Sequence, residues 1–358
     1  MAKRNTALPD TTDLDILTDP VQAAEAAGLH YTTADHPGIT RKHWGRGFTY
    51  RTPDGETIPP GSERERIEAL VIPPAWTDVW INPDPQGHIL ATGRDDAGRK
   101  QYIYHPDWRA VRDRTKFNRM IAFGQALPAI RERTDADLRR HGLPREKVLA
   151  AVVRLLEDTL IRVGNQEYAA GNDSYGLTTL RDKHVKVNTR TVRFEFNGKG
   201  GKRHEIDLHD RRLARVVKAC RDLPGYELFQ YLDADGNRAA ITSTDVNDYL
   251  RSITGEDFTA KDFRTWGATR LALATLLDAG QTDDADAIPG NIRAAVERAA
   301  DHLGNTVSVC REYYIHPGVL ERYEAGRLCD SFDPAEGASA ASDDEAVVAF
   351  LVDCWLDW

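Results

Sequence analysis

The chain has 358 residues, of which 41% are hydrophobic and 29% charged, and its formal net charge is -9. This composition is typical of a globular protein with two packed domains and excludes a largely disordered chain. The chain also lacks an apolar run near the roughly 18 residues of a membrane span, an apolar secretory signal and any CxxC cysteine pair, so we expect a cytoplasmic protein without a membrane partner, disulfide framework or zinc module.

The N-terminal part of the chain predicts a short lead segment followed by a small, mainly β domain. Residues 1–38 are acidic and weakly periodic, which indicates a weakly ordered lead segment. From 39 to 107 the pattern changes: Phe48 and Tyr50 alternate with polar residues, and Asp54-Gly55 is a hairpin turn signal. Further short strands, separated by turn residues, are expected at 79–81, 89–91 and 101–104.

Residues 108–328 predict a mostly helical domain that contains a β-hairpin, so the fold class is α+β. A helix that Pro144 opens delivers Arg162 just beyond its C-terminal end. Alternation around Val192–Phe196 and His204–Leu208 predicts the hairpin, whose glycine-rich tip GKGGKR carries Lys199. Residues 162–221 hold fourteen basic and seven acidic residues. This segment is a candidate anion-binding surface, although the same charges could simply solvate helices and strands.

The C-terminal part predicts two helices and then an acidic tail. An apolar stripe over 292–303 ends at Gly304, and Thr306 can cap a helix that reaches Tyr314. Residues 323–358 hold one basic residue and nine acidic ones, so this segment accounts for nearly all of the chain's net charge of -9. We interpret 329–358 as a tail that is solvated, competes with an anionic partner, or docks on the body. Docking would use four apolar residues at helical spacing: Val347, Phe350, Leu351 and Trp355.

Four segments carry residue types suited to phosphate chemistry. Each segment alone is weak evidence for a functional site, because a single arginine at a helix end usually caps carbonyls and a single tyrosine usually lies in a core. The segments are Leu160-Ile161-Arg162-Val163-Gly164-Asn165, Asn197-Gly198-Lys199, Lys261-Asp262-Phe263-Arg264-Thr265-Trp266-Gly267, and Leu303-Gly304-Asn305-Thr306 leading to Arg311-Glu312-Tyr313-Tyr314.

Together and in this order, the segments resemble the type IB DNA topoisomerases. The resemblance is to the poxvirus-like branch found in bacteria, whose catalytic domain shares its fold with tyrosine recombinases. It covers roughly residues 40–325. The matching stretches are IPPAWTDVWI, GRKQYIYHP, IRVGNQEYA, SYGLTTLRDKHV, KDFRTWGAT and LGNTVSVCREYYIHP.

The resemblance implies five catalytic residues: Arg162, Lys199, Arg264, Asn305 and Tyr314. The nucleophile falls on Tyr314, nine positions after Asn305, and Tyr313 is one residue short. Many relatives carry histidine where this chain has Asn305. Since an amide can donate a hydrogen bond but does not titrate near neutral pH, we expect it to stabilise an oxyanion rather than move a proton.

The chemistry of these residue types agrees with that assignment. A phenol with a pKa near 10 is a poor nucleophile at neutral pH, so attack on a phosphodiester needs positive charge at the phenolate and at the phosphorus. Two arginines can supply that charge, and Lys199 on a mobile hairpin is a plausible general acid for the departing 5′ oxygen. A 3′-phosphotyrosine retains the energy of the bond, so ATP is not expected as a cofactor. The sequence shows no cluster of carboxylates or histidines that suggests a metal site, so a divalent metal is not expected to be obligatory.

The resemblance further implies a monomeric, C-shaped clamp around double-stranded DNA that relaxes supercoils by single-strand cleavage, rotation and religation. We expect it to be cytoplasmic and nucleoid-associated. A tyrosine recombinase is the closest alternative, but that family typically has His-x-x-Arg where this chain has Lys261-Asp262-Phe263-Arg264. The other alternative is a non-catalytic DNA-binding protein. The expected DNA contacts are Gln101, Tyr102, Tyr104, Lys183, His184, Lys202 and Lys261.

Overall fold

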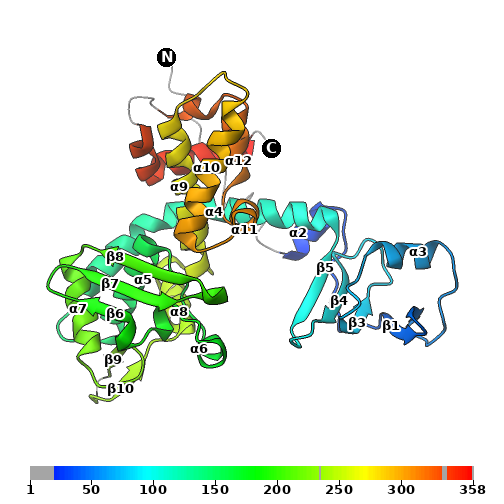
Figure 1. Ribbon diagram of the computed structural model, residues 1–358, viewed down its shortest axis with the longest axis horizontal. Coiled ribbons are helices and arrows are strands. Elements are labelled where there is room, and N and C mark those ends of the chain that lie inside the picture. The colour runs from blue at the N-terminus through cyan, green and yellow to red at the C-terminus, as the bar shows by residue number, and fades with distance from the viewer. Residues whose placement is uncertain (1–19, 234, 333–336, 357–358) are drawn as a thin grey trace. The chain divides into compact units, whose positions relative to one another are not determined.

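The computed structural model describes residues 20–233, 235–332 and 337–356, which form two compact units (Figure 1). The first unit extends to Arg119 and the second begins at Met120. The division lies inside one long helix, α4 (Pro106–Leu138), and not at the expected boundary between 107 and 108. Within the described ranges, no helix combines the length and the hydropathy that a bilayer crossing needs.

The first unit is built on an antiparallel sheet, as the alternating pattern predicted. The strand order is β2-β1-β3-β4-β5. Side chains on one face of the sheet pack with Ile67 of the helix α3 and form a small core around Ile39 and Ile81. The elements are β1 (Ile39–Trp44), β2 (Gly47–Arg51), α3 (Ser62–Ala69), β3 (Thr77–Ile81), β4 (Ile89–Arg94) and β5 (Lys100–Tyr104).

The lead segment differs from the expectation where the structure describes it. Residues 20–26 form helix α2 (Pro20–Ala26), and Ala24 and Leu29 are buried against Trp108. Their apolar side chains are too few to produce a clear helical period, so the contact with a tryptophan some 80 residues away was not predictable locally. Residues 1–19 lie outside the described ranges.

The second unit is mostly helical, which confirms the α+β class. Its central helix α5 is buried along most of its length and packs against α7, α8 and α9, and Figure 1 shows α7 beside the three-stranded sheet. The helices are α5 (Arg145–Thr159), α6 (Gln166–Asn172), α7 (Arg211–Arg221), α8 (Ser243–Thr254), α9 (Ala260–Ala279), α10 (Ala287–Leu303), α11 (Val307–Tyr313), α12 (Pro317–Glu324) and α13 (Asp344–Leu356). Short 3-10 turns are η1 (Leu177–Thr179), η2 (Asp182–His184), η3 (Lys199–Gly201), η4 (Leu328–Ser331) and η5 (Gly337–Ser342).

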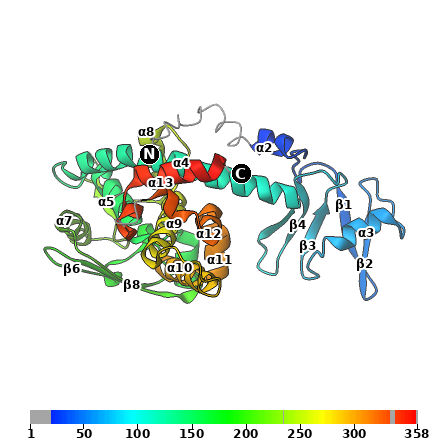
Figure 2. The ribbon, with the colours of Figure 1, turned by 90° about the horizontal axis from the view of Figure 1, so that it is seen from above.

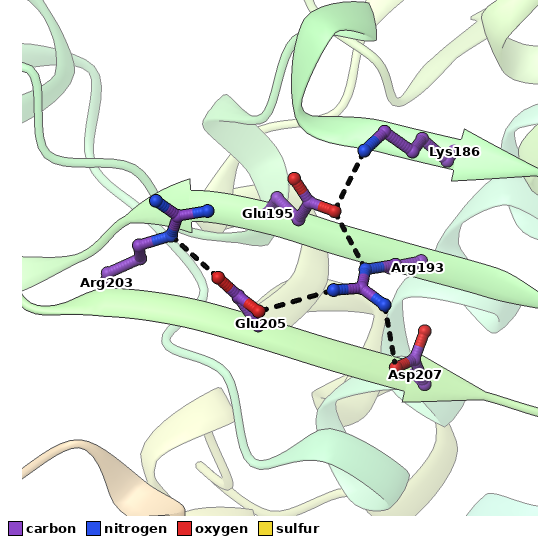
Figure 3. A network of polar contacts seen from close by, with 6 residues as sticks. All are labelled: Lys186, Arg193, Glu195, Arg203, Glu205 and Asp207. Atoms are coloured by element: carbon purple, nitrogen blue, oxygen red, sulfur yellow. Dashed lines mark hydrogen bonds and ion pairs between the residues drawn. The ribbon is translucent and has the colours of Figure 1, made fainter.

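The predicted hairpin is part of a sheet with the order β6-β7-β8. Its strands are β6 (Val185–Val187), β7 (Val192–Asn197) and β8 (Arg203–Leu208), and a separate pair is β9 (Gln230–Leu232) and β10 (Arg238–Ala240). One face of the three-stranded sheet is apolar. The other carries a ladder of charges in which Arg193 reaches Glu195 at 2.8 Å and Glu205 at 3.3 Å (Figure 3). The alternation therefore separates a packed face from a solvated one.

The acidic tail is docked where it is described. Val347, Phe350 and Leu351 are buried, as the docking alternative required, while the side chain of Trp355 lies outside the description. Helix α13 lies along α4 (Figure 2): a Cβ on Gly124 of α4 would stand 2.6 Å from Val348 Cγ2. The buried carboxylate of Asp344 pairs with Arg131 of α4 and, at 3.3 Å, with Arg270 of α9.

Candidate active site

A cavity of about 640 Å³ in the second unit brings together residues that are far apart in the sequence. Four of the five predicted catalytic residues line it, and Lys261 and Tyr175 line it as well. The four are Arg162, Lys199, Arg264 and Tyr314. The cavity is thus rich in cationic side chains, which suits an anionic substrate.

Arg162 is aimed into the cavity by the way α5 ends. The helix stops at Leu160, which adopts a left-handed conformation with φ +52° although it is not glycine. The Leu160 side chain packs where Gly267 of α9 has no side chain. The turned segment is then held by neighbouring backbone, because Leu177 N–H donates to Arg162 O at 2.9 Å. A strained residue before a functional one is common at active sites.

Arg264 comes from the first turns of α9 and is almost fully buried. Thr259 and Asp262 form a reciprocal capping box that begins the helix. The Arg264 guanidinium donates to the Leu160 carbonyl and, at 2.9 Å, to the Leu303 carbonyl. These bonds join α9 to the ends of α5 and α10, so the guanidinium is fixed before any substrate binds.

Asn305 lies between the two arginines. Gly304, with φ +64°, ends α10 in the left-handed conformation and turns the chain toward the cavity. Asn305 Oδ1 accepts a hydrogen bond from Arg162 Nη2 and another from Arg264 Nη2 at 3.4 Å. Because two cationic donors fix which end of the amide is the oxygen, Nδ2 is left as the free donor, and it has no acceptor among the described residues.

Tyr314 follows the last turn of α11. Its backbone N–H donates to Cys310 O at 3.0 Å, and its carbonyl accepts from Thr269 of α9 at 3.2 Å. The half-buried phenol ring lies under Arg264, with the guanidinium carbon 5.3 Å from the ring centroid. Tyr313 is 38% exposed and does not line the cavity. The structure thus brings Tyr314, and not its neighbour, to the arginines.

Lys199 is exposed on the loop between β7 and β8. Gly198 N–H donates to Lys202 O at 2.8 Å and closes the loop, while Gly200 and Gly201 have positive φ values. Tyr175 N–H donates to Asn197 O at 2.8 Å and braces the end of β7. The backbone of the loop is therefore anchored while the lysine side chain is flexible, and Lys199 lines the same cavity as Tyr314.

The electrostatics of the site favour an anion. Burial and the proximity of Arg162 lower the pKa of Arg264 to about 10, and burial also lowers the pKa of Arg162. Over the described part of the chain, neither guanidinium forms an ion pair with a carboxylate. Arg264 is buried and Arg162 is half-buried, so holding both cations without a carboxylate partner is costly, and a bound phosphate would relieve that cost.

Comparison with known proteins identifies the family. Residues 105–328 match the eukaryotic DNA topoisomerase I catalytic core, and residues 47–95 match the bacterial DNA topoisomerase IB N-terminal domain. The DNA topoisomerase 1B of Acanthamoeba polyphaga mimivirus is 33% identical over 297 residues, covering 80% of this chain and 88% of the relative. The chain belongs to the type IB DNA topoisomerase family. More distant relatives are the DNA topoisomerase 1 of rabbit fibroma virus, 26% identical over 77% of this chain and 89% of the relative, and the DNA topoisomerase 1B of vaccinia virus strain Copenhagen, 21% identical over 74% and 83%.

The family membership establishes the activity. This type IB topoisomerase relaxes supercoiled DNA through transient cleavage by a tyrosine, which is the mechanism general to the family.

The predicted DNA contacts of the topoisomerase differ in exposure. Tyr102 is 41% exposed and its ring stacks on Tyr104 at 5.7 Å, so the two do share a face. Gln101 donates to Asp95 at 2.8 Å. Lys183 and Lys202 are exposed, as is Lys261 at the start of α9. His184, in contrast, is 7% exposed and accepts the Arg181 N–H, which favours a structural role.

Two residues next to the predicted catalytic set were not singled out by the sequence analysis. Thr269 of α9 holds the backbone at Tyr314, and His204 of β8 touches the turn before Asn305. The signal for His204 was present in the alternation, because it falls on the apolar face of the hairpin between Phe196 and Ile206, where a histidine is unusual. Thr269 carried no signal in an otherwise ordinary helix.

Proposed function

We propose that Tyr314 is the nucleophile with which this topoisomerase cleaves one strand of duplex DNA. The phenol oxygen attacks the phosphorus, a bond from Oη to phosphorus forms, and the bond from phosphorus to the 5′ oxygen breaks. The phenol proton passes to solvent water, and the bonding electron pair leaves with the 5′ oxygen. The observation that supports the nucleophile is the position of the ring under Arg264 inside a cationic cavity.

Arg162 and Arg264 are proposed to hold the two nonbridging oxygens, with Asn305 Nδ2 as a third donor. Because the arginines are already fixed through Asn305 Oδ1 and through backbone carbonyls, little reorganisation is needed when charge develops at phosphorus. Arginines that stabilise phosphoryl transfer are worth about 10³ to 10⁵ in rate.

Lys199 is proposed as the general acid that protonates the departing 5′ oxygen. Its ammonium extends from an anchored loop on the wall of the same cavity as Tyr314. Lys261, on the first turn of α9, is proposed to hold an adjacent phosphate, where the positive end of the helix adds to its charge.

Religation is proposed to reverse these steps after strand rotation. The phosphotyrosine keeps the energy of the broken bond, and two guanidinium groups supply the charge that a metal would otherwise provide. We therefore propose that neither ATP nor a divalent metal is obligatory. A monomeric, clamp-like engagement of DNA and a cytoplasmic, nucleoid-associated location are expected from the family resemblance and stay predictions.

Plasmid relaxation tests the proposal. Wild type, Tyr314→Phe and the neighbouring control Tyr313→Phe are incubated with negatively supercoiled plasmid in EDTA without ATP. Wild type and Tyr313→Phe should relax the plasmid, and Tyr314→Phe should bind it without relaxing it or forming a covalent adduct. Relaxation by Tyr314→Phe would overturn the assignment of the nucleophile, and failure of wild type until metal or ATP is added would overturn the cofactor proposal.

A further inference from the structure

The ring of His204 is wedged between two glycines that flank the catalytic groups. A Cβ on Gly198 would lie 2.6 Å from His204 Nε2 and 2.7 Å from Cδ2. A Cβ on Gly304 would lie 2.6 Å from His204 Cε1 and 3.0 Å from Nε2. Gly198 directly precedes Lys199, and Gly304 directly precedes Asn305. One side chain thus touches both the loop of the predicted general acid and the turn of the predicted oxyanion donor.

The sheet holds the ring in that place. His204 pairs in register with Phe196, and their rings are stacked with centroids 5.1 Å apart and an interplanar angle of 16°. The neighbours of His204 on β8 point the other way: Arg203 and Glu205 belong to the charge ladder on the solvated face (Figure 3). Successive side chains of a strand alternate between its two faces. The charge ladder and the contact of His204 with the two glycines therefore lie on opposite faces of β8.

The two glycines are needed for different reasons. Gly304 has φ +64°, so its backbone conformation alone favours glycine. Gly198 has φ -93° and ψ -167°, which any residue can adopt. The space that the histidine ring occupies is therefore the reason that a side chain is excluded at Gly198, and Lys202 O, at 3.6 Å, is the other near atom.

The ring is neutral in this position. Burial and the charges of Arg162, Arg264 and Lys202 lower the pKa of His204 to about 4. A charged side chain here would add a third cation beside the two arginines, whereas a neutral ring packs against both glycines without competing for the phosphate.

We propose that His204 is a positioning residue, which holds the loop carrying Lys199 against the turn carrying Asn305 and so sets the place from which Lys199 delivers its proton. The inference rests on the proposed role of Lys199 as general acid. A shift of about 1 Å in a catalytic group can cost about 100-fold in rate, so loosening this contact should slow cleavage without weakening the binding of DNA.

A double-mutant cycle tests the contact. His204→Ala removes the ring, and Gly198→Ala pushes against it while leaving every other side chain in place. Each should lower the single-turnover cleavage rate about 10- to 100-fold, with DNA affinity retained. Gly198→Ala should add no further loss in the His204→Ala background, because its clash partner is gone. The matched control is Glu205→Gln, on the solvated face one residue away, which should cleave as wild type does.

Replacing the scissile 5′ oxygen by sulfur tests the mechanism. A thiolate leaves without a proton, so a defect in proton delivery disappears on this substrate. His204→Ala and Gly198→Ala should then cleave nearly as fast as wild type on the same DNA, as should Lys199→Ala. If Lys199→Ala recovers and the other two do not, the positioning role is wrong. If Lys199→Ala does not recover, the general-acid proposal itself fails, and the inference fails with it. Additive losses in the cycle would likewise overturn the inference. If His204→Ala does not fold, Gly198→Ala is compared with Glu205→Gln on both substrates, and a Gly198→Ala defect that persists on the sulfur substrate would overturn the inference.

Discussion

The buried hydroxyl of Thr269, in the middle of α9, donates a hydrogen bond to the carbonyl of Tyr314 at 3.2 Å. The same oxygen accepts the N–H of His316 at 3.0 Å. A single side chain therefore holds the backbone on both sides of Ile315, just where α11 has ended and no helical bond is available. The proposed nucleophile is thus fixed to the helix that also carries Arg264.

Thr269→Val should reduce both cleavage and stability. The change keeps the shape but leaves one buried donor and one buried acceptor without partners, which costs about 1–3 kcal/mol per group. We expect cleavage to slow about 10- to 100-fold as Tyr314 loosens. Single-turnover cleavage and urea unfolding measure the two effects. Thr275→Val, whose hydroxyl bonds within α9 to Leu271 O at 2.7 Å, is the control and should keep wild-type cleavage.

The cleavage rates of Asn305→Ala and Asn305→Asp should differ, because only the aspartate adds a negative charge beside the two arginines. The alanine variant loses the Nδ2 donor and should cleave about 10²- to 10³-fold more slowly. The aspartate variant keeps an acceptor for Arg162 and Arg264 but neutralises part of the charge that awaits the phosphate. It should cleave still more slowly and bind DNA more weakly. Equal rates for the two variants in a cleavage time course would argue against electrostatic stabilisation here.

Arg264→Lys should abolish most activity although charge is conserved. An ammonium cannot reach the Leu160 and Leu303 carbonyls together and still present a fork to phosphate. We expect a cleavage rate about 10³-fold or more below wild type. Arg293→Lys is the control, because Arg293 is exposed and its ion pair is with Glu297, one turn away on the same helix. A mild defect in Arg264→Lys would show that charge alone suffices.

Stability should fall as the pH is lowered from about 6.5 to about 4. Burial lowers the pKa values of His184 and His204 to about 4, and lowers those of His88 and His302. The unfolded chain protonates these rings near pH 6.5, whereas the folded chain protonates them at lower pH, and His184 and His204 only near pH 4, so the unfolded state takes up more protons in this window. Burial also raises the pKa values of two carboxyl groups, that of Asp158 to about 6 and that of Asp182, and these two groups act in the opposite direction.

Urea unfolding midpoints at pH 7 and pH 5 measure this dependence. His184→Asn, which retains an acceptor for the Arg181 N–H, should show a smaller drop between the two pH values than wild type. The exposed His209→Asn should show the same drop as wild type. An unchanged drop in His184→Asn would mean that the buried ring does not contribute.

Asp344→Ala should destabilise the second unit without entering the chemistry. The substitution leaves Arg131 and Arg270 without the carboxylate that joins α4 and α9 to the tail, and breaking a buried pair typically costs about 3–5 kcal/mol. The melting temperature should fall, while plasmid relaxation per folded molecule at low temperature should persist. The exposed neighbour Glu345→Gln should melt like wild type. Loss of relaxation without loss of stability would assign the tail a role in DNA handling.

The amino-acid sequence by itself determined the fold class and the hairpin, and its motifs, through their resemblance to a family, gave the predicted catalytic set. These depend on local chemistry: strand alternation, glycine turns, helix caps, and short motifs such as Lys261-Asp262-Phe263-Arg264 that stay together wherever the elements pack. Tyr314 could be distinguished from Tyr313 for the same reason, because its spacing from Asn305 is a property of the chain.

Only the tertiary structure decided how the groups act on one another. Arg162 and Asn305 are 143 positions apart, and the shared Oδ1 that orders both arginines depends on where α5, α9 and α10 end in space. Three other contacts also join segments that are distant in the sequence: His204 against Gly198 and Gly304, Thr269 with the backbone at Tyr314, and Asp344 of the tail with Arg270. Contacts between distant segments depend on the packing of whole elements to within about an ångström, and no local pattern of residues carries that information.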